Sequence, residues 1–438
     1  MDSADSKLQL VDFPSEEWKI AGNIAMHCKN SVLLMGVCDG ILPLLLCVFG
    51  CDVYGIDSEE SVSTGLENAY IFGLSPRFAV QDIFKPIRLT SGLFDTVVIG
   101  PVVSHMPDFL LIVKEACRLV RNNGLVIFVH NSKNIFKYLS SNNIPLNISF
   151  EIQQNKKNIV VALSHMNSEC SVSGIGKEEI VNNFFLPPIS LERLDITKKV
   201  SIIIPTFNRA LYLKEAIESA VNQTYDNTEI IVIDDGSTDD TSEVVRFYTD
   251  NITYMHKENG GKSSALNMAI QKASGDYIWY LDDDDIALPK KLELQMRYLQ
   301  KFPENAILFT GALGFTDTKL FRKVDYSYLV PSIKKDDLLL RFLEDCIVTG
   351  QSALVESQCF KTIGHYRNDL RRSEDHEMWI RIARKFPLGF LNFPTILRRS
   401  HEGLRGGKDA NSNPKDHDLE GLIYGRLFFP EVYNSLSL

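Results

Sequence analysis

The chain lacks the features of a disulfide-linked secreted protein. Its eight cysteines are scattered over 438 residues and form no Cys-x-x-Cys pair, a pattern that argues against a zinc ribbon and against a thioredoxin-type redox site. Several of them lie inside apolar stretches, where a free cysteine behaves as a small buried hydrophobe. We therefore expect free thiols and a reducing, cytoplasmic setting.

A long apolar run and an excess of positive charge are also missing. The most apolar segment, residues 41–51, is about half as long as the roughly 20 residues that a membrane-spanning helix needs, and the acidic N-terminus has no signal-peptide core. We expect no transmembrane segment, and contact with a membrane surface at most. Forty-six basic against 56 acidic residues give a net charge of −10, which argues against a nucleic-acid partner.

What the chain does contain is the composition of a globular protein. Hydrophobic residues make up 45% and charged residues 23%, and the length corresponds to two or three domains of about 100–200 residues. Short β-branched runs alternate with helical patterns, which predicts α/β domains built on parallel sheets. The alternation weakens between about residues 164 and 198. We predict two Rossmann-like domains: residues 1–165 and 198–412, joined by a linker at 166–197 and followed by a tail at 413–438.

Two local patterns predict helices with defined ends. An apolar stripe from Leu110 to Val120 predicts a helix that Asn123-Gly124 closes as a C-cap. In the second half, apolar positions from Leu213 to Val221 predict a helix that Asn208 caps at its N-terminus.

Three polar loops each follow a predicted strand in the second half. They are Pro205–Arg209, Asp234–Thr238 and Asp282–Asp285. Ligands of open parallel sheets bind beyond the carboxyl ends of the strands, so we expect the loops to converge. Four carboxylates at a buried strand end are electrostatically costly unless a cation neutralises them, and such oxygen ligands suit Mg²⁺ or Mn²⁺. A solvated turn is the simpler interpretation of an isolated aspartate run.

Six motifs, in order, resemble those of the family 2 glycosyltransferases over about residues 200–407. They are Ile203–Arg209, Ile233–Asp239, Asn259–Gly261 with Ala265–Asn267, Gly275–Tyr277, Leu281–Asp285 and Glu374–Trp379. The resemblance implies a nucleotide-sugar-binding α/β domain of the GT-A type and an enzyme that inverts the anomeric carbon.

The resemblance also implies roles for individual residues. Asp235 would meet the nucleotide base, Asp282 to Asp284 would form an Asp-x-Asp metal element, and Asp375 would be the general base. The implied donor-binding residues are Pro205, Thr206, Asn208, Arg209, Asp234, Asp235, Asn259, Gly261, Lys262, Asn267, Asp282 and Asp283, and the implied metal ligands are Asp282, Asp284 and His401.

Plainer interpretations stand beside several of these roles. Glu374 and Asp375 could be first-turn charges that favour the helix dipole. His401 could be a surface histidine. Arg398, Arg399 and Arg405 could bind phosphate or be solvated.

The chemistry of such a transfer needs these kinds of group. A divalent ion stabilises the charge of a departing nucleoside diphosphate, and a carboxylate such as Asp375 takes the proton from the acceptor hydroxyl in a single displacement. The chain lacks the Gln-x-x-Arg-Trp element and the membrane helices of processive synthases in this family, so we expect a non-processive enzyme. The resemblance favours a UDP-sugar donor and a glycan or lipid-linked glycan acceptor.

The first half resembles a class I S-adenosylmethionine-dependent methyltransferase domain over about residues 15–165. Gly36 and Gly40 follow a predicted strand, Asp57 ends the next strand, and Gln81-Asp82 stands further along the chain. The resemblance implies that these four residues bind S-adenosylmethionine, with Asp57 on the ribose and Asp82 on the adenine.

The sequence departs from the methyltransferase pattern at two positions. Leu34 replaces an acidic residue, and Cys38 replaces a glycine, where a side chain would obstruct close approach of the backbone. Three hypotheses stay open: a glycosyltransferase with a structural or docking domain, a bifunctional enzyme that also methylates the glycan, and a non-catalytic nucleotide- or glycan-binding scaffold.

Overall fold

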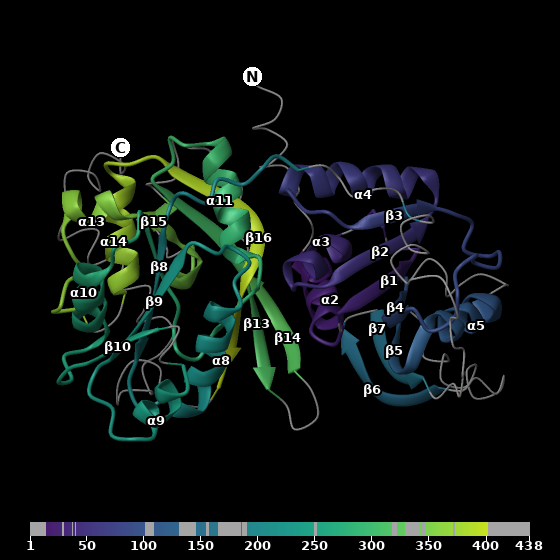
Figure 1. Cartoon of the computed structure of the whole chain (residues 1–438), viewed down its shortest axis with the longest axis horizontal. Coiled ribbons are helices and arrows are strands. Elements are labelled where there is room, and N and C mark those ends of the chain that lie inside the picture. Colours follow the sequence, from purple (N-terminus) through teal and green to yellow (C-terminus); the bar gives the residue numbers. More distant parts are fainter. Residues whose placement is uncertain are drawn as a thin grey trace. The chain divides into compact units, whose positions relative to one another are not determined.

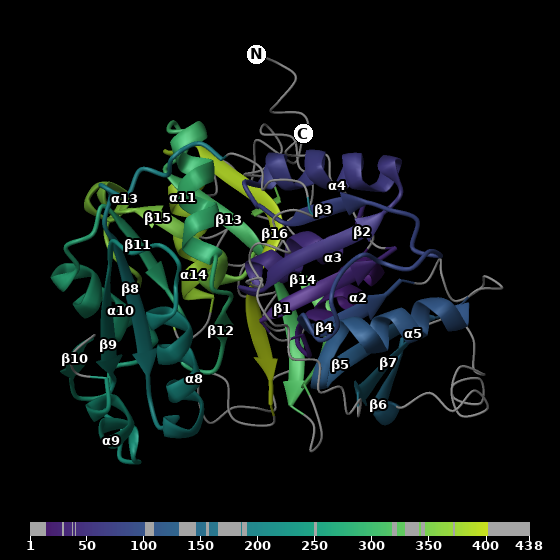
Figure 2. The ribbon, with the colours of Figure 1, turned by 45° about the vertical axis from the view of Figure 1, so that its right-hand side comes forward.

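The chain divides into two compact units, one of residues 13–193 and one that begins at Leu194 (Figures 1 and 2). The computed structural model describes residues 15–28, 30–36, 38–39, 41–100, 109–130, 146–154, 157–164, 185, 191–248, 252–317, 322–328, 341–342, 347–370 and 373–401. The predicted tail and most of the predicted linker lie outside these residues.

The first unit is built on a seven-stranded sheet. Its elements are α2 (Ser15–Ala25), β1 (Ser31–Met35), α3 (Ile41–Val48), β2 (Asp52–Asp57), α4 (Glu59–Phe72), β3 (Arg77–Val80), β4 (Phe94–Ile99), α5 (Phe109–Leu119), β5 (Val120–His130), β6 (Leu146–Gln154) and β7 (Lys157–Ser164). The strand order is β3-β2-β1-β4-β5-β7-β6, parallel as far as β5, with β7 antiparallel to β5 and to β6. This confirms the predicted α/β class for the first half.

The core of the first unit explains why its strands are continuous apolar runs. Every residue of β1 is buried, as expected for a parallel strand covered on both faces. The eight residues of α3 are also all buried, so this helix is apolar all round.

The predicted end of the helix before β5 is wrong. The helix α5 ends at Leu119, and Val120 already pairs with Phe94 of β4. Asn123, with a φ of 61°, and Gly124 lie within β5, where the register between β4 and β5 shifts. Pairing with a neighbouring strand therefore overrides a local sequence signal that is typical of a helix C-cap.

The second unit contains a nine-stranded sheet. Its elements are β8 (Val200–Thr206), α8 (Ala210–Val221), β9 (Thr228–Asp234), α9 (Thr241–Arg246), β10 (Thr253–His256), α10 (Lys262–Lys272), β11 (Tyr277–Tyr280), β12 (Ile286–Ala287), α11 (Lys291–Lys301), β13 (Ile307–Asp317), β14 (Arg322–Tyr328), the 3₁₀ turn η3 (Gly350–Ser352), β15 (Leu354–Glu356), α13 (Ser357–Ile363), α14 (Glu374–Ala383) and β16 (Leu388–Ser400).

The sheet of the second unit is parallel in one half and mixed in the other. The strand order is β10-β9-β8-β11-β15-β13-β16-β12, with β14 beside β13. Strands β8 to β11 run parallel, whereas β15 is antiparallel to both β11 and β13. The α/β class is again confirmed. The parallel pairing suggested by the alternating pattern holds for β8–β11 and for the pair β13–β16, and the antiparallel strand β15 separates them.

The three polar loops leave the sheet at one edge. Thr206 at the end of β8 pairs with Asp234 at the end of β9, and Tyr280 at the end of β11 pairs with Ile203 of β8. The backbone N–H of Asp235 donates to the Thr206 carbonyl at 2.9 Å. The carboxyl ends of these strands therefore meet, as the sequence predicts.

Asn208 does not cap α8 as predicted. The helix begins at Ala210, its N-cap position is Arg209, and no side chain caps it. Asn208 adopts a φ of 53°, and its Oδ1 accepts the N–H of Thr238 at 2.7 Å. It ties the first polar loop to the second instead.

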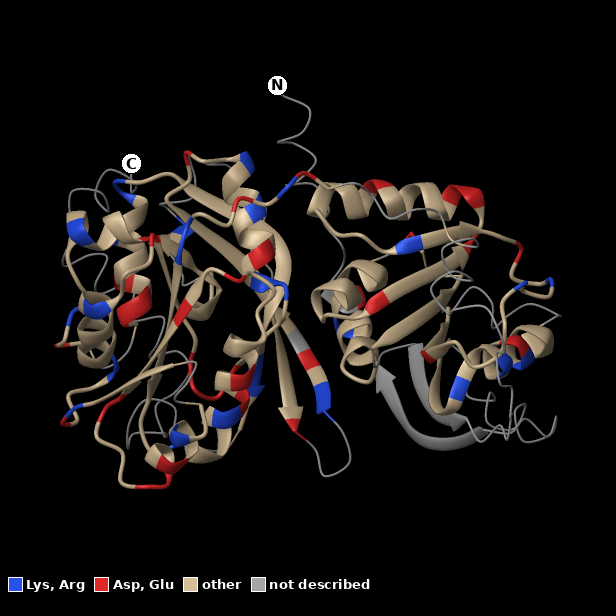
Figure 3. Cartoon of the chain, viewed as in Figure 1, with Lys and Arg blue, Asp and Glu red and all other residues tan. Residues whose placement is uncertain are grey.

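Acidic and basic residues occur along both units. Figure 3 shows acidic and basic segments interspersed in each unit.

Within the described part of the chain, no helix combines the length and the apolar composition needed to cross a bilayer.

Candidate functional site

The aspartate run after β11 forms a compact group of carboxylates. One oxygen each from Asp282, Asp284 and Asp285 lies within 4.8 Å of the others. Hard oxygen donors at this spacing fit a divalent cation such as Mg²⁺ or Mn²⁺. Burial, with a contribution from the charge of Asp284, raises the pKa of Asp285 well above its ordinary value.

Basic side chains of the protein itself contact this acidic group. Arg209 Nη1 lies 3.1 Å from Asp283 Oδ1 and 2.6 Å from Asp284 Oδ2. His401 Nε2 lies 2.8 Å from the same Asp284 oxygen. Burial raises the pKa of Asp283 to about 7, although the charge of Arg209 opposes this shift. Arg209 therefore offsets part of the negative charge of this loop, as the cost of gathering carboxylates at a buried strand end leads one to expect.

Lys262 connects the acidic loop with helix α14. Its Nζ lies 2.6 Å from Asp282 Oδ1 and 3.6 Å from Glu374 Oε1, and it sits 4.9 Å from the centre of the Tyr280 ring. Burial lowers the pKa of Lys262, but the charges of Asp282 and Glu374 outweigh that effect and raise it. The lysine is therefore charged between two carboxylates.

Arg399 supports the acidic loop through its main chain and its side chain. Its backbone N–H donates to Asp285 Oδ1 at 2.9 Å, and its Nε donates to the Asp284 carbonyl at 3.0 Å. The residue is 2% exposed, so it is neither solvated nor placed as a surface phosphate ligand. Arg405 lies outside the described residues.

The guanidinium of Arg399 also joins separate elements. It forms ion pairs with Glu215 of α8 and Asp317 of β13. The rings of Tyr212 and Phe315 lie 5.0 and 4.7 Å from it. In β16, Leu397 and Arg399 are both buried, whereas Arg398 between them is only half-buried. Side chains alternate between the two faces of a strand, so this period of two is a sequence signal that could have distinguished Arg399 from Arg398.

The loop after β9 is closed around the carboxylate of Asp235. Its Oδ1 accepts the N–H of Gly260 at 3.0 Å and faces Lys257 Nζ at 2.6 Å, while Oδ2 accepts the N–H of Gly261 at 2.7 Å. Asp235 thereby fixes the glycine loop that leads into Lys262.

The neighbouring Asp234 accepts hydrogen bonds from the same loop and from β10. It accepts the N–H of Ser237 at 2.8 Å and the hydroxyl of Tyr254 at 2.6 Å. Gly236 has a φ of 87°, and a Cβ there would lie 2.9 Å from the Asn259 nitrogen, so this turn requires glycine.

Other predicted donor-binding residues lie at the same edge with different surroundings. Pro205 and Thr206 are buried at the end of β8, and Asn259 is exposed. Asn267 uses its amide to hold the backbone of Tyr366, donating to its carbonyl at 2.8 Å and accepting its N–H at 2.8 Å. Its contacts are thus structural in this conformation.

The predicted base lies in the first turn of α14. Asp375 Oδ1 accepts the N–H of His376 at 2.8 Å. Ser373, directly before the helix, has a φ of 55°, which is uncommon for a residue with a side chain. Burial raises the pKa of the adjacent Glu374 to about 7, while the charge of Lys262 opposes the shift.

Turn η3 lies between Asp282 and Asp375, and nothing in the sequence marks it. Gln351 Nε2 donates to Asp282 Oδ2. A Cβ at Gly350 would overlap Tyr280 Oη and lie 2.7 Å from Asp375 Oδ2. Glycine at this position therefore lets the turn approach both sides of the site.

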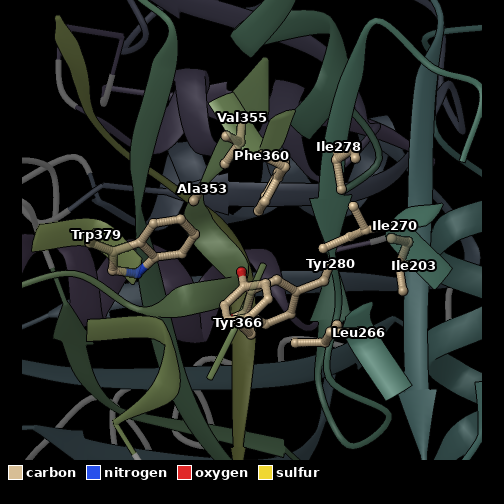
Figure 4. A pocket seen from close by; sticks show the side chains of 10 residues that line it. All are labelled: Ile203, Leu266, Ile270, Ile278, Tyr280, Ala353, Val355, Phe360, Tyr366 and Trp379. Atoms are coloured by element: carbon tan, nitrogen blue, oxygen red, sulfur yellow. The ribbon is translucent and has the colours of Figure 1, made fainter. Parts of the chain in front are cut away.

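A small apolar cavity underlies this region (Figure 4). Its volume of about 10 Å³ corresponds to one water at most, which is too small for a nucleotide. Tyr280 and Tyr366 pack edge to face in its wall, and Trp379 lines it as well. Trp379 therefore packs in the interior.

The proposed nucleoside site of the first unit retains its acidic residue. Asp57 ends β2, and its two oxygens accept the N–H groups of Cys38 at 3.2 Å and Ser58 at 2.8 Å. Burial raises the pKa of Asp57. Asp82 is exposed and accepts the N–H of Phe84 at 3.0 Å.

Cys38, which replaces a glycine of the methyltransferase pattern, lies in the interior of the first unit. Its side chain is fully buried and packs with Val62 and Phe78. A Cβ at Gly55 would overlap its Sγ, so the absence of a side chain there makes room for it. Gly36 has a φ of 72°, and Gly40 lies outside the described residues.

Comparisons with known proteins match the two halves separately. The family model described as glycosyl transferase family 2 matches residues 201–364, and the one described as methyltransferase domain matches residues 33–128. An uncharacterised glycosyltransferase of Rickettsia prowazekii is 37% identical over 224 residues, which are 50% of this chain and 70% of that protein.

Two further proteins are similar over about half of this chain. An uncharacterised glycosyltransferase of Rickettsia felis is 38% identical over 218 residues, 49% of this chain, and the chain spans only 36% of that relative. The solved structure of residues 1–349 of S. aureus TarS in complex with UDP-GlcNAc is similar with a TM-score of 0.42 and 22% identity, covering 50% of this chain and 63% of that one.

Proposed function

The chain belongs to the family 2 glycosyltransferases, and from this premise we propose that it moves a sugar from a nucleotide-sugar to a hydroxyl of a separate acceptor, with inversion. The observation that carries the proposal is the linkage, through Lys262, of the acidic loop to the helix that bears Asp375. The candidate metal-binding loop and the helix of the candidate base thus both contact one lysine.

The acidic loop supplies the donor side. Asp282, Asp284 and Asp285 fit a divalent cation, with His401 beside Asp284. Such a cation, when bound, offsets the charge on the diphosphate leaving group. Asp235 fixes the adjoining glycine loop and is our candidate for contact with the nucleotide base.

Helix α14 supplies the acceptor side. Asp375 takes the proton of the acceptor hydroxyl as that oxygen bonds to the anomeric carbon and the bond to the diphosphate breaks. The electron pair of the broken bond leaves with the nucleoside diphosphate, and a single displacement inverts the carbon. We propose a glycan or lipid-linked glycan as the acceptor.

A panel of nucleotide-sugars tests the proposal. With Mn²⁺ present, one donor, with UDP-sugars tried first, is expected to raise the melting temperature and to be hydrolysed slowly. Asp284→Asn should lose the metal-dependent part of both effects. The anomeric configuration of the product, read by NMR, should be opposite to that of the donor. If no donor stabilises the protein or is turned over, the proposal is wrong.

A second candidate activity is methyl transfer by the first unit. The observation that favours it is Asp57, whose carboxylate is fixed at the end of β2 by the loop that follows β1. Calorimetry of the full chain with S-adenosylmethionine, with Asp57→Ala as the control, tests it. No measurable affinity in the wild type would leave the first unit without this role.

A further inference from the structure

Lys291 is a buried lysine that the proposed transfer does not use. It is the first residue of α11, it is 0% exposed, and burial lowers its pKa well below the ordinary value. Its Nζ donates to the carbonyl of Ser352 at 3.2 Å and lies 5.0 Å from the centre of the Trp279 ring. A polar amino group is costly to bury without hydrogen-bond partners, so its position calls for a physical reason.

Several buried donors converge on the same turn. The Ser352 carbonyl also accepts Gln295 Nε2 at 2.9 Å and Thr310 Oγ1 at 3.4 Å. Trp279 Nε1 donates to the Gln351 carbonyl at 2.7 Å. Donors from α11, β11 and β13 therefore fix two consecutive carbonyls of η3. Lys291 and Gln295 lie one helical turn apart, so both reach the turn from the same face of α11.

The fixed turn contacts both sides of the candidate site. Gln351 donates to Asp282, on the donor side. Gly350 lies against Tyr280 Oη and Asp375 Oδ2, on the side of the base. The position of η3 therefore affects the separation between Asp282 and Asp375.

We propose that Lys291 is a positioning residue for the transfer reaction. It holds the Ser352 carbonyl, and through η3 it sets the carboxylate of Asp282 relative to that of Asp375. This role of Lys291 rests on the proposed function, in which Asp282 belongs to the donor side and Asp375 is the base. Lys291 itself touches neither substrate.

The first test compares Lys291→Met with Lys290→Met. Lys290 is the half-buried neighbour at the N-cap of α11 and serves as a matched control. We expect Lys291→Met to stay folded, because methionine has a similar volume and buries no amino group. Its kcat should fall on the order of tenfold or more while the donor KM changes less than about twofold, since misplaced groups slow the chemical step. Lys290→Met should match the wild type.

Hydrogen exchange gives a readout that needs no activity. The N–H groups of Ser352 and Ala353 donate within the turn to Thr349 and Gly350. Their exchange should become faster in Lys291→Met and stay unchanged in Lys290→Met. Unchanged exchange in Lys291→Met would overturn the proposal even if the enzyme is a glycosyltransferase. Absence of transfer in the wild type would instead overturn the proposed function.

A double-mutant cycle tests whether Lys291 acts through Gln351. Gln351→Leu removes the donor to Asp282. If Lys291 acts through the turn, the double variant should lose no more kcat than the more damaging of the two single variants. Losses that multiply would contradict the proposal. Gln295→Met removes a second donor to the Ser352 carbonyl, so it should lower kcat and speed hydrogen exchange as Lys291→Met does. It takes the place of Lys291→Met if that variant does not fold.

Discussion

At the scale of single residues, the candidate site is a set of carboxylates whose charges are matched in pairs. Arg209 faces Asp284, Lys262 faces Asp282, and Lys257 faces Asp235. These side chains are all partly or fully buried, where an unpaired charge is costly. A ligand that enters the site must therefore exchange contacts with existing partners.

The role of Asp375 as base predicts the effect of one substitution. Asp375→Asn keeps the shape of the side chain but removes the proton acceptor, so kcat should fall by about 10²–10⁴-fold. Binding of the donor with Mn²⁺, measured by calorimetry, should stay near the wild-type affinity. Near-normal turnover in this variant would show that another group is the base.

Glu374 predicts a dependence of stability on pH. Its folded pKa of about 7 lies above the ordinary value of 4.5, so the folded state binds the proton more tightly than the unfolded state. Its contribution to stability is present below pH 4.5 and is lost as the pH rises through about 7. The melting temperature of Glu374→Gln should therefore fall less than that of the wild type between pH 5 and pH 8. Parallel curves for the two proteins would contradict the assignment.

At the scale of the elements, strands and helices far apart in the sequence meet at buried polar contacts. Arg399 of β16 joins α8 through Glu215, which lies 184 positions away along the chain, and joins β13 through Asp317. Turn η3 in the same way receives donors from three elements. These contacts fix where the polar loops stand on the sheet.

Removing Arg399 should destabilise the protein. Arg399→Met leaves the carbonyl of Asp284 without this donor, and it leaves Glu215 and Asp317 without this partner. We expect a loss on the order of 3 kcal/mol in the free energy of unfolding, less than for a fully buried pair because both carboxylates keep solvent contact. Urea unfolding measures it. Arg398→Met, at the next position of β16, is the control and should cost clearly less.

Adding a methyl group to η3 should disturb the site. In Gly350→Ala the new Cβ overlaps Tyr280 Oη, so the turn or the tyrosine must move. Both kcat and the melting temperature should fall. Tyr280→Phe removes the overlapping oxygen, so it should restore part of the melting temperature in the double variant. If Tyr280→Phe brings no recovery, steric conflict with that hydroxyl is not the cause.

At the scale of the whole molecule, each unit carries its own sheet and its own candidate site. The second unit combines an acidic loop with cationic side chains in a chain of net charge −10. The acidic loop is therefore paired with cationic side chains of the protein itself, and we propose that a divalent ion binds beside them.

Metal removal tests this view on the full chain. A chelator should abolish transfer, and Mn²⁺ or Mg²⁺ should restore it in the wild type, because the donor set suits hard divalent cations. Asp284→Asn should not recover at the same metal concentration. Full activity in excess chelator would mean that the protein's own cations suffice for the leaving group.

Patterns within short segments explain which predictions succeed. The α/β class and the shared edge of the three polar loops follow from apolar runs that alternate with polar turns. The caps assigned to Asn123-Gly124 and Asn208 fail for the opposite reason. Asn123 and Asn208 both have a left-handed φ. Asn123 lies where the register between β4 and β5 shifts, and Asn208 accepts the N–H of Thr238 in another loop, which no local pattern reveals.

The sequence by itself determined the α/β class of the chain, its family and the loops that carry the carboxylates, because hydrophobic periodicity and ordered motifs are local properties. Only the tertiary structure decided which cation meets which carboxylate. His401 meets Asp284 across 117 positions, and Lys291 meets Ser352 across 61. Such contacts depend on how strands and helices pack in space, and the separation of two residues along the sequence does not give the distance between them in the folded protein.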